Sequence, residues 1–445
     1  MSRLDELKTD ILAKMAEYER LRQADESRPF RPGVDRVNYA GRWYGPEELV
    51  SLGEAALEFW LTYGRFSRRL EQDLAARHGA RACLLVNSGS SANLLALASL
   101  TSPLLKDRAL RPGDEVITTA CGFPTTCAPI VQLGLRPVFV DVALPGANLN
   151  PAQLEAALGP RTRAVMAAHT LGNPFDLAAV SEFCERHGLW LVEDNCDALG
   201  GLYAGRPTGS WGHLASLSFY PAHHITTGEG GAVLINDGAL KRPALSLRDW
   251  GRDCWCDSGR DDTCQKRFGQ QHGSLPFGYD HKYVYSHFGY NLKMTDLQAA
   301  VGCAQIERLD EVVRRRRENH AYLHAALADW QDYFILPQAT QGSEPSWFGF
   351  LLTVRAAAPF GKQELVEHLE AGLIQTRQLF GGNLVRQPLF SDLAEGRDYR
   401  LAAPLRVTDR IMHDSFWIGV HPGLDRPRLD YMIARIRAFA EGSGA

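Results

Sequence analysis

The spacing of four cysteines in this chain, and the polar sequence around three of them, indicate a metal site. Cys196, Cys254, Cys256 and Cys264 form the pattern C-x57-C-x1-C-x7-C, and the last three lie in a polar, glycine-rich stretch. Cysteines in such a stretch are not typical of a hydrophobic core, so we expect them to be ligands. Thiolates bind zinc as well as iron–sulfur clusters, and this spacing matches neither common ferredoxin pattern. The residues alone therefore leave the metal open.

Two further segments could bind an anionic cofactor. In the segment 86–97 (VNSGSSANLLAL), Gly89 and Ser90 lie where a strand is expected to pass into a helix. Free amides at a helix N-terminus, together with hydroxyl groups, suit a phosphate, although an ordinary serine cap would give the same pattern. Asp194 ends the apolar run 189–194, at the edge where α/β sheets bind their ligands. Its carboxylate could pair with a protonated ring nitrogen or simply cap a helix.

Two adjacent histidines, His223 and His224, lie in the segment 216–233 (SLSFYPAHHITTGEGGAV). We expect this segment to form a strand, a polar turn and a glycine-rich return into a second strand. Neighbouring residues on an extended chain point to opposite faces. The two histidines are therefore not expected to bind one metal ion.

Composition excludes several classes of protein. The chain has 445 residues, of which 45% are hydrophobic and 22% are charged, as in ordinary globular proteins. Its 48 basic and 52 acidic residues give a net charge of −4, so there is no basic excess of the kind that binds nucleic acid or membrane surfaces. No apolar run reaches the roughly 18 to 20 residues that a membrane span needs, and the N-terminus lacks a signal-peptide core. We expect a cytoplasmic protein.

The elements that must position these residues follow an alternating pattern. Short apolar runs expected to be strands alternate with helical segments; they cover 83–87, 114–120, 136–142, 163–169 and 189–195. This pattern predicts an α/β fold with a mostly parallel sheet that is covered on both faces. We expect a helix and an extended arm over 1–44, a large cofactor-binding domain over 45–310 and a smaller α+β domain over 311–445. The large domain would contain a cysteine-rich loop over 247–290, and one long helix over 295–327 would begin in it.

In this order, the segments resemble the DegT/DnrJ/EryC1/StrS group of sugar aminotransferases. The similarity runs from about residue 45 to the C-terminus and includes the motifs SGSSA, DEVITTACGFPTT, AHTLGNPFDL, EDNCDALG, SFYPAHHITTGEGG and GYNLKMTDLQAA. It implies a fold type I, aspartate-aminotransferase-like enzyme that uses pyridoxal phosphate. By this resemblance, phosphate would be held by Gly89, Ser90 and Ser218. Phe123 would stack on the pyridine ring, Asp194 would pair with its nitrogen and Asp197 would lie near its hydroxyl.

The resemblance also implies a homodimer, because Asn291 of the GYN motif would reach the phosphate bound by the partner subunit. One departure from the family pattern concerns the reaction. The aminotransferases of this group have the turn SF-x-P-x-K, whose lysine forms a Schiff base, whereas this chain has His223 there and no lysine between Lys106 and Lys241. An imidazole cannot form that bond, but it can act as a general base. We therefore expect pyridoxamine phosphate as the cofactor, with His223 removing a proton from its 4′ carbon.

In having a histidine in place of the lysine, this chain resembles the 4-keto-6-deoxyhexose 3-dehydratases. The four-cysteine spacing resembles that of their iron–sulfur members, which act on CDP-4-keto-6-deoxyglucose in 3,6-dideoxysugar biosynthesis. This similarity implies a [2Fe–2S] cluster on Cys196, Cys254, Cys256 and Cys264. It also implies that an NADH-dependent flavin iron–sulfur reductase delivers electrons for removal of the C3 hydroxyl.

Two alternatives remain at this stage. One is the same chemistry on a dTDP-linked sugar in an antibiotic pathway, because no residue that reads the nucleotide base can be identified. The other is a non-catalytic scaffold with zinc in the thiolate site. The presence of Ser90, Asp194, Ser218 and Asn291 argues against the scaffold.

Overall fold

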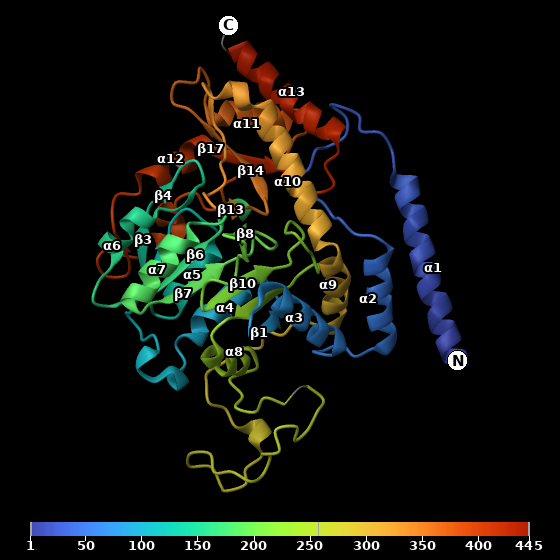
Figure 1. Ribbon diagram of the computed structural model, residues 1–445, viewed down its shortest axis with the longest axis vertical. Coiled ribbons are helices and arrows are strands. Elements are labelled where there is room, and N and C mark those ends of the chain that lie inside the picture. The colour runs from blue at the N-terminus through green and yellow to red at the C-terminus, as the bar shows by residue number, and fades with distance from the viewer. Residues whose placement is uncertain (1, 257, 444–445) are drawn as a thin grey trace.

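The computed structural model describes residues 2–256 and 258–443, and a large helix-covered sheet forms its centre (Figure 1). In these residues the sheet has eight strands, in the order β1-β11-β10-β7-β6-β2-β3-β16. Their bounds are β1 (Ala82–Val86), β11 (Gly231–Ile235), β10 (Leu214–Ser218), β7 (Trp190–Asp194), β6 (Thr162–Ala168), β2 (Glu115–Thr119), β3 (Arg136–Val140) and β16 (Arg400–Leu401). Every strand except β11 runs in the same direction, so the mostly parallel sheet is confirmed.

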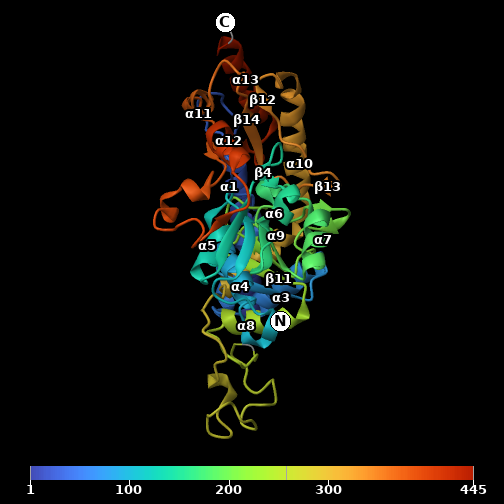
Figure 2. The same cartoon turned by 90° about the vertical axis from the view of Figure 1, so that its left-hand side faces the viewer.

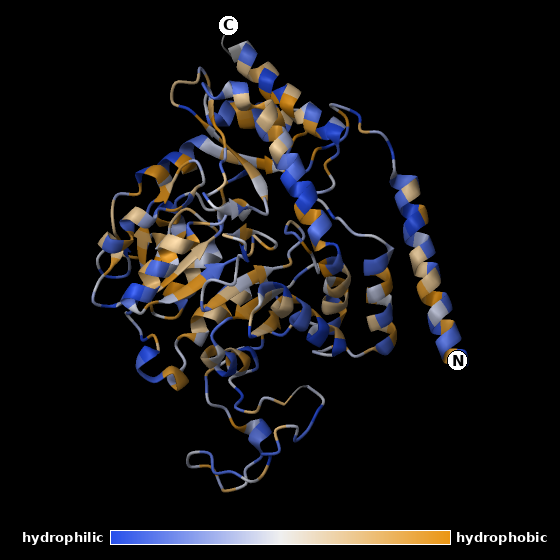
Figure 3. Cartoon of the chain, in the orientation of Figure 1, coloured by the Kyte–Doolittle hydropathy of each residue, from blue (hydrophilic) through white to orange (hydrophobic). Residues whose placement is uncertain are grey.

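Alternating side chains along each strand explain why helices cover both faces of this sheet. In β1, Leu84 packs into one core cluster, and Cys83 and Leu85 pack into another on the opposite face. The first face is covered by α4 (Gly89–Ser99), α5 (Pro124–Gln132) and α8 (Lys241–Arg248). The second is covered by α3 (Arg65–His78), α6 (Leu154–Ala157), α7 (Leu177–His187) and α9 (Asp296–Glu307). Figure 3 shows hydrophobic residues gathered along the central strands.

A second, smaller sheet is antiparallel and lies near the C-terminus. Its order is β12 (Phe334–Ile335), β14 (Gly349–Val354), β17 (Ser415–Gly419) and β15 (Thr376–Gln378). The helices α10 (Leu309–Ala326), α11 (Lys362–Ala371) and α13 (Arg426–Ser443) share a core with it, and α12 (Arg406–Asp414) immediately precedes β17. From the same C-terminal part of the chain, β16 joins the large sheet beside β3. The division at residues 44 and 310 stays a prediction.

Short strand pairs and the N-terminal helices complete the fold. The short strands are β4 (Val142–Ala143), β5 (Asn148–Leu149), β8 (Leu202–Tyr203), β9 (Arg206–Pro207) and β13 (Ser343–Glu344). The helix α1 (Arg3–Glu26) lies along the outside of α2 (Pro46–Glu58), where Lys8 and Glu54 form an ion pair at 3.0 Å (Figure 1). In the described residues no helix is both long and apolar enough to cross a membrane.

The helix expected over 295–327 is two helices, α9 and α10, so that expectation is wrong in detail. The chain turns at Arg308, whose amide donates to the carbonyls of Gln305 and Ile306 instead of continuing a regular α-helix. The two helices have different neighbours, because α9 packs in the large-sheet core whereas α10 reaches the small sheet. Tertiary packing therefore breaks a helix that is continuous in the hydrophobic pattern.

Residues 249–256 and 258–290, which we call the cysteine loop, project away from the body of the molecule (Figure 2). The loop contains the turn of 3₁₀ helix His281–Tyr283 and begins where α8 ends. At its base, Gly251 has φ +82°, and a Cβ there would collide with the backbone of His287. Only glycine fits this close approach of the two ends of the loop.

Replacing Gly251 by alanine should open the base of the cysteine loop while leaving the sheet intact. We expect faster protease cleavage within 252–290 and little change in the thermal midpoint of the body. Gly269→Ala is the matched control, because a Cβ at Gly269 meets nothing within 4 Å. Equal cleavage rates for the two variants would contradict the importance of this contact.

Candidate active site and metal centre

A cavity of about 610 Å³ opens at the carboxyl ends of β7 and β10. It brings together seven of the residues that the sequence singled out for the cofactor site and its base: Gly89, Ser90, Phe123, Asp194, Asp197, Ser218 and His223. Asn291 does not line it; this residue is exposed, and its backbone bridges to Asp249 at the base of the cysteine loop. That Asn291 reaches the phosphate bound by the partner subunit stays a prediction.

The carboxylate of Asp194 is buried and held by four donors. One oxygen accepts from Asn93 Nδ2 at 2.8 Å and from Thr126 Oγ1 at 2.7 Å. The other accepts from the Cys196 amide and from Ser216 Oγ, each at 3.2 Å. These bonds fix the orientation of an anion at the end of β7, facing the cavity. Such a group is suited to pair with a cation in the cavity, for example a protonated ring nitrogen.

The predicted phosphate site is formed by the start of α4 and the end of β10. Ser88 caps α4 and accepts from the Ser91 amide, and Ser88, Gly89 and Ser90 at this helix N-terminus line the cavity. A Cβ at Gly89 would collide with Ser218, which shows how closely the two elements approach. The hydroxyls of Ser90 and Ser218 border this position. Amides and hydroxyls at a helix N-terminus form an environment that fits a phosphate.

His223 lies inside the cavity with its Nδ1 atom 3.6 Å from an Asp197 oxygen. Burial, reinforced by Arg316, lowers the pKa of His223 to about 3. Burial and the nearby Asp194 charge raise the pKa of Asp197 to about 8. At neutral pH the imidazole is therefore uncharged, which is the form that can accept a proton.

The second histidine of the pair, His224, points elsewhere. Its Nε2 atom lies 2.9 Å from the carbonyl of Ser346, and it does not line the cavity. The two neighbouring side chains therefore have different surroundings, as expected for adjacent residues of an extended turn.

A buried arginine holds the turn that carries His223. Arg316 of α10 donates to the carbonyls of Ala222 at 2.9 Å and His223 at 3.2 Å, and also to those of Trp347 and Phe348. Sequence analysis missed this residue because it lies in the run RRRR at 314–317, which looks like a solvent-exposed face. It also missed Asn93, Thr126 and Ser216, whose side chains are ordinary in type.

The opposite wall of the cavity comes from the C-terminal part of the chain. Arg377 is the only lysine or arginine among the described lining residues, and its guanidinium lies 3.9 Å from the ring centre of Tyr39. Phe123 is 51% exposed, and its ring meets that of Phe380 edge-on at 5.9 Å. The cavity thus has the carboxylate of Asp194 on one side, and a guanidinium and aromatic rings on the other.

Three of the four predicted metal ligands come together in the cysteine loop. The sulfur atoms of Cys254, Cys256 and Cys264 lie within 4.8 Å of one another. Burial opposes ionisation of Cys256, but hydrogen bonds from Thr263 and from the Cys264 backbone outweigh it and lower the pKa of this thiol. The fourth predicted ligand, Cys196, lies in the cofactor cavity instead, with its sulfur 3.6 Å from Ser216 Oγ.

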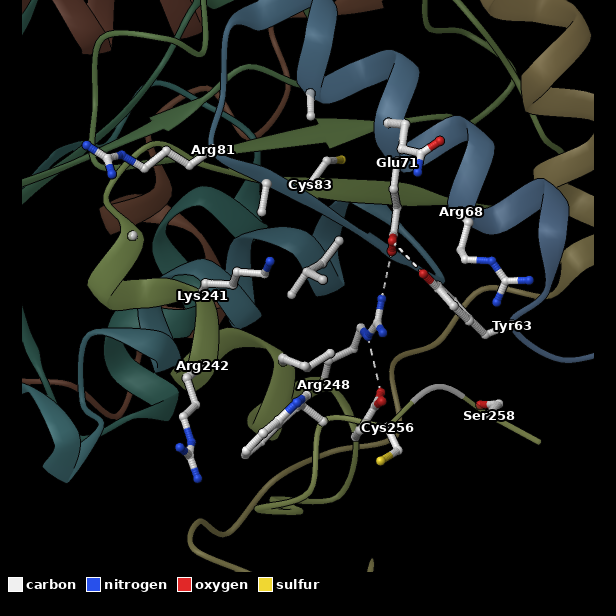
Figure 4. Close-up of a pocket in the computed structure, with 18 of the residues that line it drawn as sticks. Tyr63, Arg68, Glu71, Arg81, Cys83, Lys241, Arg242, Arg248, Cys256 and Ser258 are labelled. Atoms are coloured by element: carbon white, nitrogen blue, oxygen red, sulfur yellow. Dashed lines mark hydrogen bonds and ion pairs between the residues drawn. The ribbon is translucent and has the colours of Figure 1, made fainter. Parts of the chain in front are cut away.

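A separate cavity of about 670 Å³ lies between α3, β1, α8 and the cysteine loop (Figure 4). Within it, Arg248 forms ion pairs with Glu71 at 2.9 Å and with Asp249 at 3.1 Å. Figure 4 shows Arg248 between Glu71 above and the cysteine loop below, where Cys256 lies. These pairs tie the base of the loop to the body of the protein.

The fold and the cavity define a class of protein. A mostly parallel sheet with a phosphate-type site, a buried aspartate and a reactive turn at one edge is the architecture of fold type I pyridoxal-phosphate-dependent enzymes. The chain belongs to the DegT/DnrJ/EryC1/StrS aminotransferase family, whose sequence profile matches residues 45–437.

Three relatives illustrate the similarity. The lipopolysaccharide biosynthesis protein RfbH of Salmonella typhimurium is 50% identical over 433 residues, covering 97% of this chain and 98% of its own. The dTDP-4-dehydro-2,6-dideoxy-D-glucose 3-dehydratase of Saccharopolyspora spinosa is 50% identical over 436 residues, covering 98% of this chain and 93% of its own. The crystal structure of a GDP-4-keto-6-deoxymannose-3-dehydratase mutant with bound GDP-perosamine superposes with a TM-score of 0.81 at 25% identity, covering 90% of this chain and 100% of that one.

In the cofactor-free protein, His223 should remain neutral from about pH 5 to about pH 8, whereas a free imidazole titrates at about pH 6.5. Burial lowers its pKa to about 3, so protonation would begin only in acid. Nitrogen NMR of histidine-labelled protein measures this, and His223→Asn identifies the resonance. A midpoint above about pH 6 would show that the imidazole is not held in its neutral form.

Proposed function

We propose that this protein removes the C3 hydroxyl from a nucleotide-linked 4-keto-6-deoxyhexose, with pyridoxamine phosphate as its cofactor. The observation that carries the proposal is His223, whose side chain is 13% exposed and uncharged at neutral pH, in a cavity whose described lining residues include no lysine. An aminotransferase of this fold needs a lysine amine to form its Schiff base. A neutral imidazole supports proton abstraction instead.

The chemistry of the cavity fits this cofactor. Amides and hydroxyls at Gly89, Ser90 and Ser218 suit its phosphate, and the fixed Asp194 carboxylate suits a protonated ring nitrogen. We assign Phe123 to the ring face and Asp197 to the neighbourhood of the ring hydroxyl. When bound, the cofactor supplies an electron-accepting ring that stabilises the negative charge left by loss of its 4′ proton.

The chain's own residues then have distinct tasks. His223 accepts the 4′ proton, and Arg316 holds the turn in place through its bonds to the carbonyls of Ala222 and His223. Asp194, whose carboxylate is fixed by its four donors, would pair with the ring nitrogen and favour its protonated form. The Asp197 carboxyl, protonated below about pH 8, adds no second negative charge beside the base.

A nucleotide-linked sugar suits the mouth of the cavity. The Arg377 guanidinium beside Tyr39 is a planar donor of the kind that binds phosphate groups. The resemblance in sequence favours CDP-4-keto-6-deoxyglucose, whereas a relative that is 50% identical is named for a dTDP-linked sugar. We propose the CDP-linked sugar as the substrate and the dTDP-linked sugar as the second candidate. Turnover measured with CDP- and dTDP-4-keto-6-deoxyglucose separates them.

We further propose that Cys196, Cys254, Cys256 and Cys264 are the ligands of a [2Fe–2S] cluster that passes electrons from an NADH-dependent flavin iron–sulfur reductase. The convergence of the Cys254, Cys256 and Cys264 sulfur atoms supports a metal site. Cys196, the fourth ligand that the resemblance supplies, lies apart from them in the same subunit. The proposed enzyme is a cytoplasmic homodimer in which Asn291 reaches the phosphate of the partner subunit.

His223→Asn should retain pyridoxamine phosphate but lose dehydration by at least about 100-fold, because the 4′ proton has no acceptor. Cofactor content by absorbance and turnover by product analysis measure the two effects. His224→Gln is the control, since His224 lies outside the cavity. Near-normal turnover of His223→Asn would show that another group is the base.

Replacing Cys254 or Cys256 by serine should abolish the visible absorption of the cluster and electron transfer from the reductase. Solvent exchange of the 4′ proton should survive, because His223 and Asp194 are untouched. Cys184→Ala is the control, since Cys184 lies on α7 and is buried in the core. Stoichiometric zinc after anaerobic purification, together with normal deoxygenation, would contradict the iron–sulfur assignment.

A further inference from the structure

The cavity between α3, β1, α8 and the cysteine loop carries a local excess of positive charge. Five basic and two acidic side chains are among its described lining residues: Arg68, Arg81, Lys241, Arg242 and Arg248, with Glu71 and Asp249. The whole chain has a net charge of −4, so this excess is not a general property of the protein. A concentration of one sign of charge in a cleft attracts ligands of the opposite sign.

The two carboxylates of the cavity do not cancel this excess, because a buried arginine already occupies both. Arg248, whose side chain is 4% exposed, pairs with Glu71 at 2.9 Å and with Asp249 at 3.1 Å. Arg81 and Lys241 are exposed, and in the described part of the chain neither forms an ion pair. Their charges are therefore available to a partner in solution.

The side of the cavity nearest the cysteines combines an exposed aromatic ring with further cations. Trp255 is 39% exposed and lies between Cys254 and Cys256, which both line the cavity. The Arg242 guanidinium lies 5.1 Å from the centre of the indole ring, and Lys266 Nζ lies 5.7 Å from it. Tryptophan and arginine are the residues that most often dominate the binding energy of protein interfaces.

The arrangement of the cations favours an extended partner over a small anion. Figure 4 shows the charged ends of Arg81, Arg242 and Arg68 on different sides of the cavity. A site for a small ligand needs a few polar groups that converge on one point. An acidic protein surface instead presents several separated carboxylates, and such a surface is complementary to cations spread around a rim.

We propose that this cavity and its rim, formed by Arg81, Lys241, Arg242, Trp255 and Lys266, are the docking surface for an acidic protein that donates single electrons to the metal centre of the cysteine loop. One electron leaves the reduced donor and enters the oxidised centre, and no bond is formed or broken. The inference rests on the proposed function for the electron-accepting centre, but not for binding of the acidic partner. Redox partners form small, transient interfaces, so a few charges are sufficient.

Charge reversal at the rim tests the proposal. The probe is a plant-type [2Fe–2S] ferredoxin, an acidic one-electron donor, and its binding to the full-length protein is measured by titration calorimetry. The double variant Lys241→Glu, Arg81→Glu should weaken binding at least about 10-fold at low ionic strength, because the long-range attraction is reversed. Binding to the wild-type protein should weaken steeply with added salt, and binding to the variant should depend less on salt.

A matched control separates this surface from the overall charge of the protein. The double variant Arg20→Glu, Arg36→Glu changes the net charge by the same amount at two exposed positions that do not line the cavity. It should bind the ferredoxin with nearly the wild-type affinity. Equal loss of binding in both double variants would show that only net charge matters and would overturn the proposal.

Reduction of the centre is measured by stopped-flow absorbance with two donors of opposite charge. With reduced ferredoxin, the rate for Lys241→Glu, Arg81→Glu should fall at least about 10-fold. With reduced methyl viologen, a small cation, the rate should stay the same or rise. Equal ferredoxin rates in the wild-type protein and this variant would contradict the docking surface. Tighter binding of inorganic pyrophosphate than of ferredoxin, lost in the same variant, would identify a small-anion site instead.

The outcomes also distinguish this inference from the proposed function. If the wild-type protein holds zinc and still binds ferredoxin through the rim, the docking surface is supported while the iron–sulfur assignment fails. If methyl viologen reduces the centre and the sugar is deoxygenated, but charge reversal leaves ferredoxin binding unchanged, the proposed function stands and the docking surface is wrong.

Discussion

The buried carboxylate of Asp194 is the charge around which the cavity is organised. Its four donors come from α4, α5, β10 and its own turn, so one side chain connects the elements that form the floor of the site. Its field raises the pKa of Asp197, after burial, and so keeps that carboxyl protonated beside His223. A second full negative charge in this buried space would be costly, and protonation of Asp197 avoids it.

A second buried charge, that of Arg316, connects the two parts of the chain. Burial lowers the pKa of its guanidinium to about 10, which still leaves it protonated at neutral pH. The charge is satisfied by four backbone carbonyls, two in the turn of His223 and two at Trp347 and Phe348. Because a buried cation must keep all its acceptors, the position of the reactive turn depends on the position of the C-terminal elements.

The cysteine loop is organised on a different principle. The lining residues of the cofactor cavity come from the sheet edge and from the wall beyond it, whereas the loop is held by glycine contacts and ion pairs at its base. Within it, Asp253, His281 and the three cysteines form a compact polar group instead of a hydrophobic core. Two centres of different chemistry are thus carried by separate parts of one chain.

The sequence by itself determined the alternating elements and the residues whose types are chemically distinctive. Short apolar runs predicted the strands that became β1, β2, β3, β6 and β7, and the motifs shared with the family predicted seven residues that line one cavity. The absence of lysine at position 223 was equally visible in the sequence.

The tertiary structure alone decided which ordinary side chains support these residues. Asn93, Thr126 and Ser216 became partners of Asp194, and one arginine of four in a row became buried, because helices and strands distant in sequence meet there. It also separated Cys196 from the other three cysteines and placed His281 beside Cys264. Spacing along the chain could not predict these particular contacts, since they depend on how segments distant in sequence meet in three dimensions.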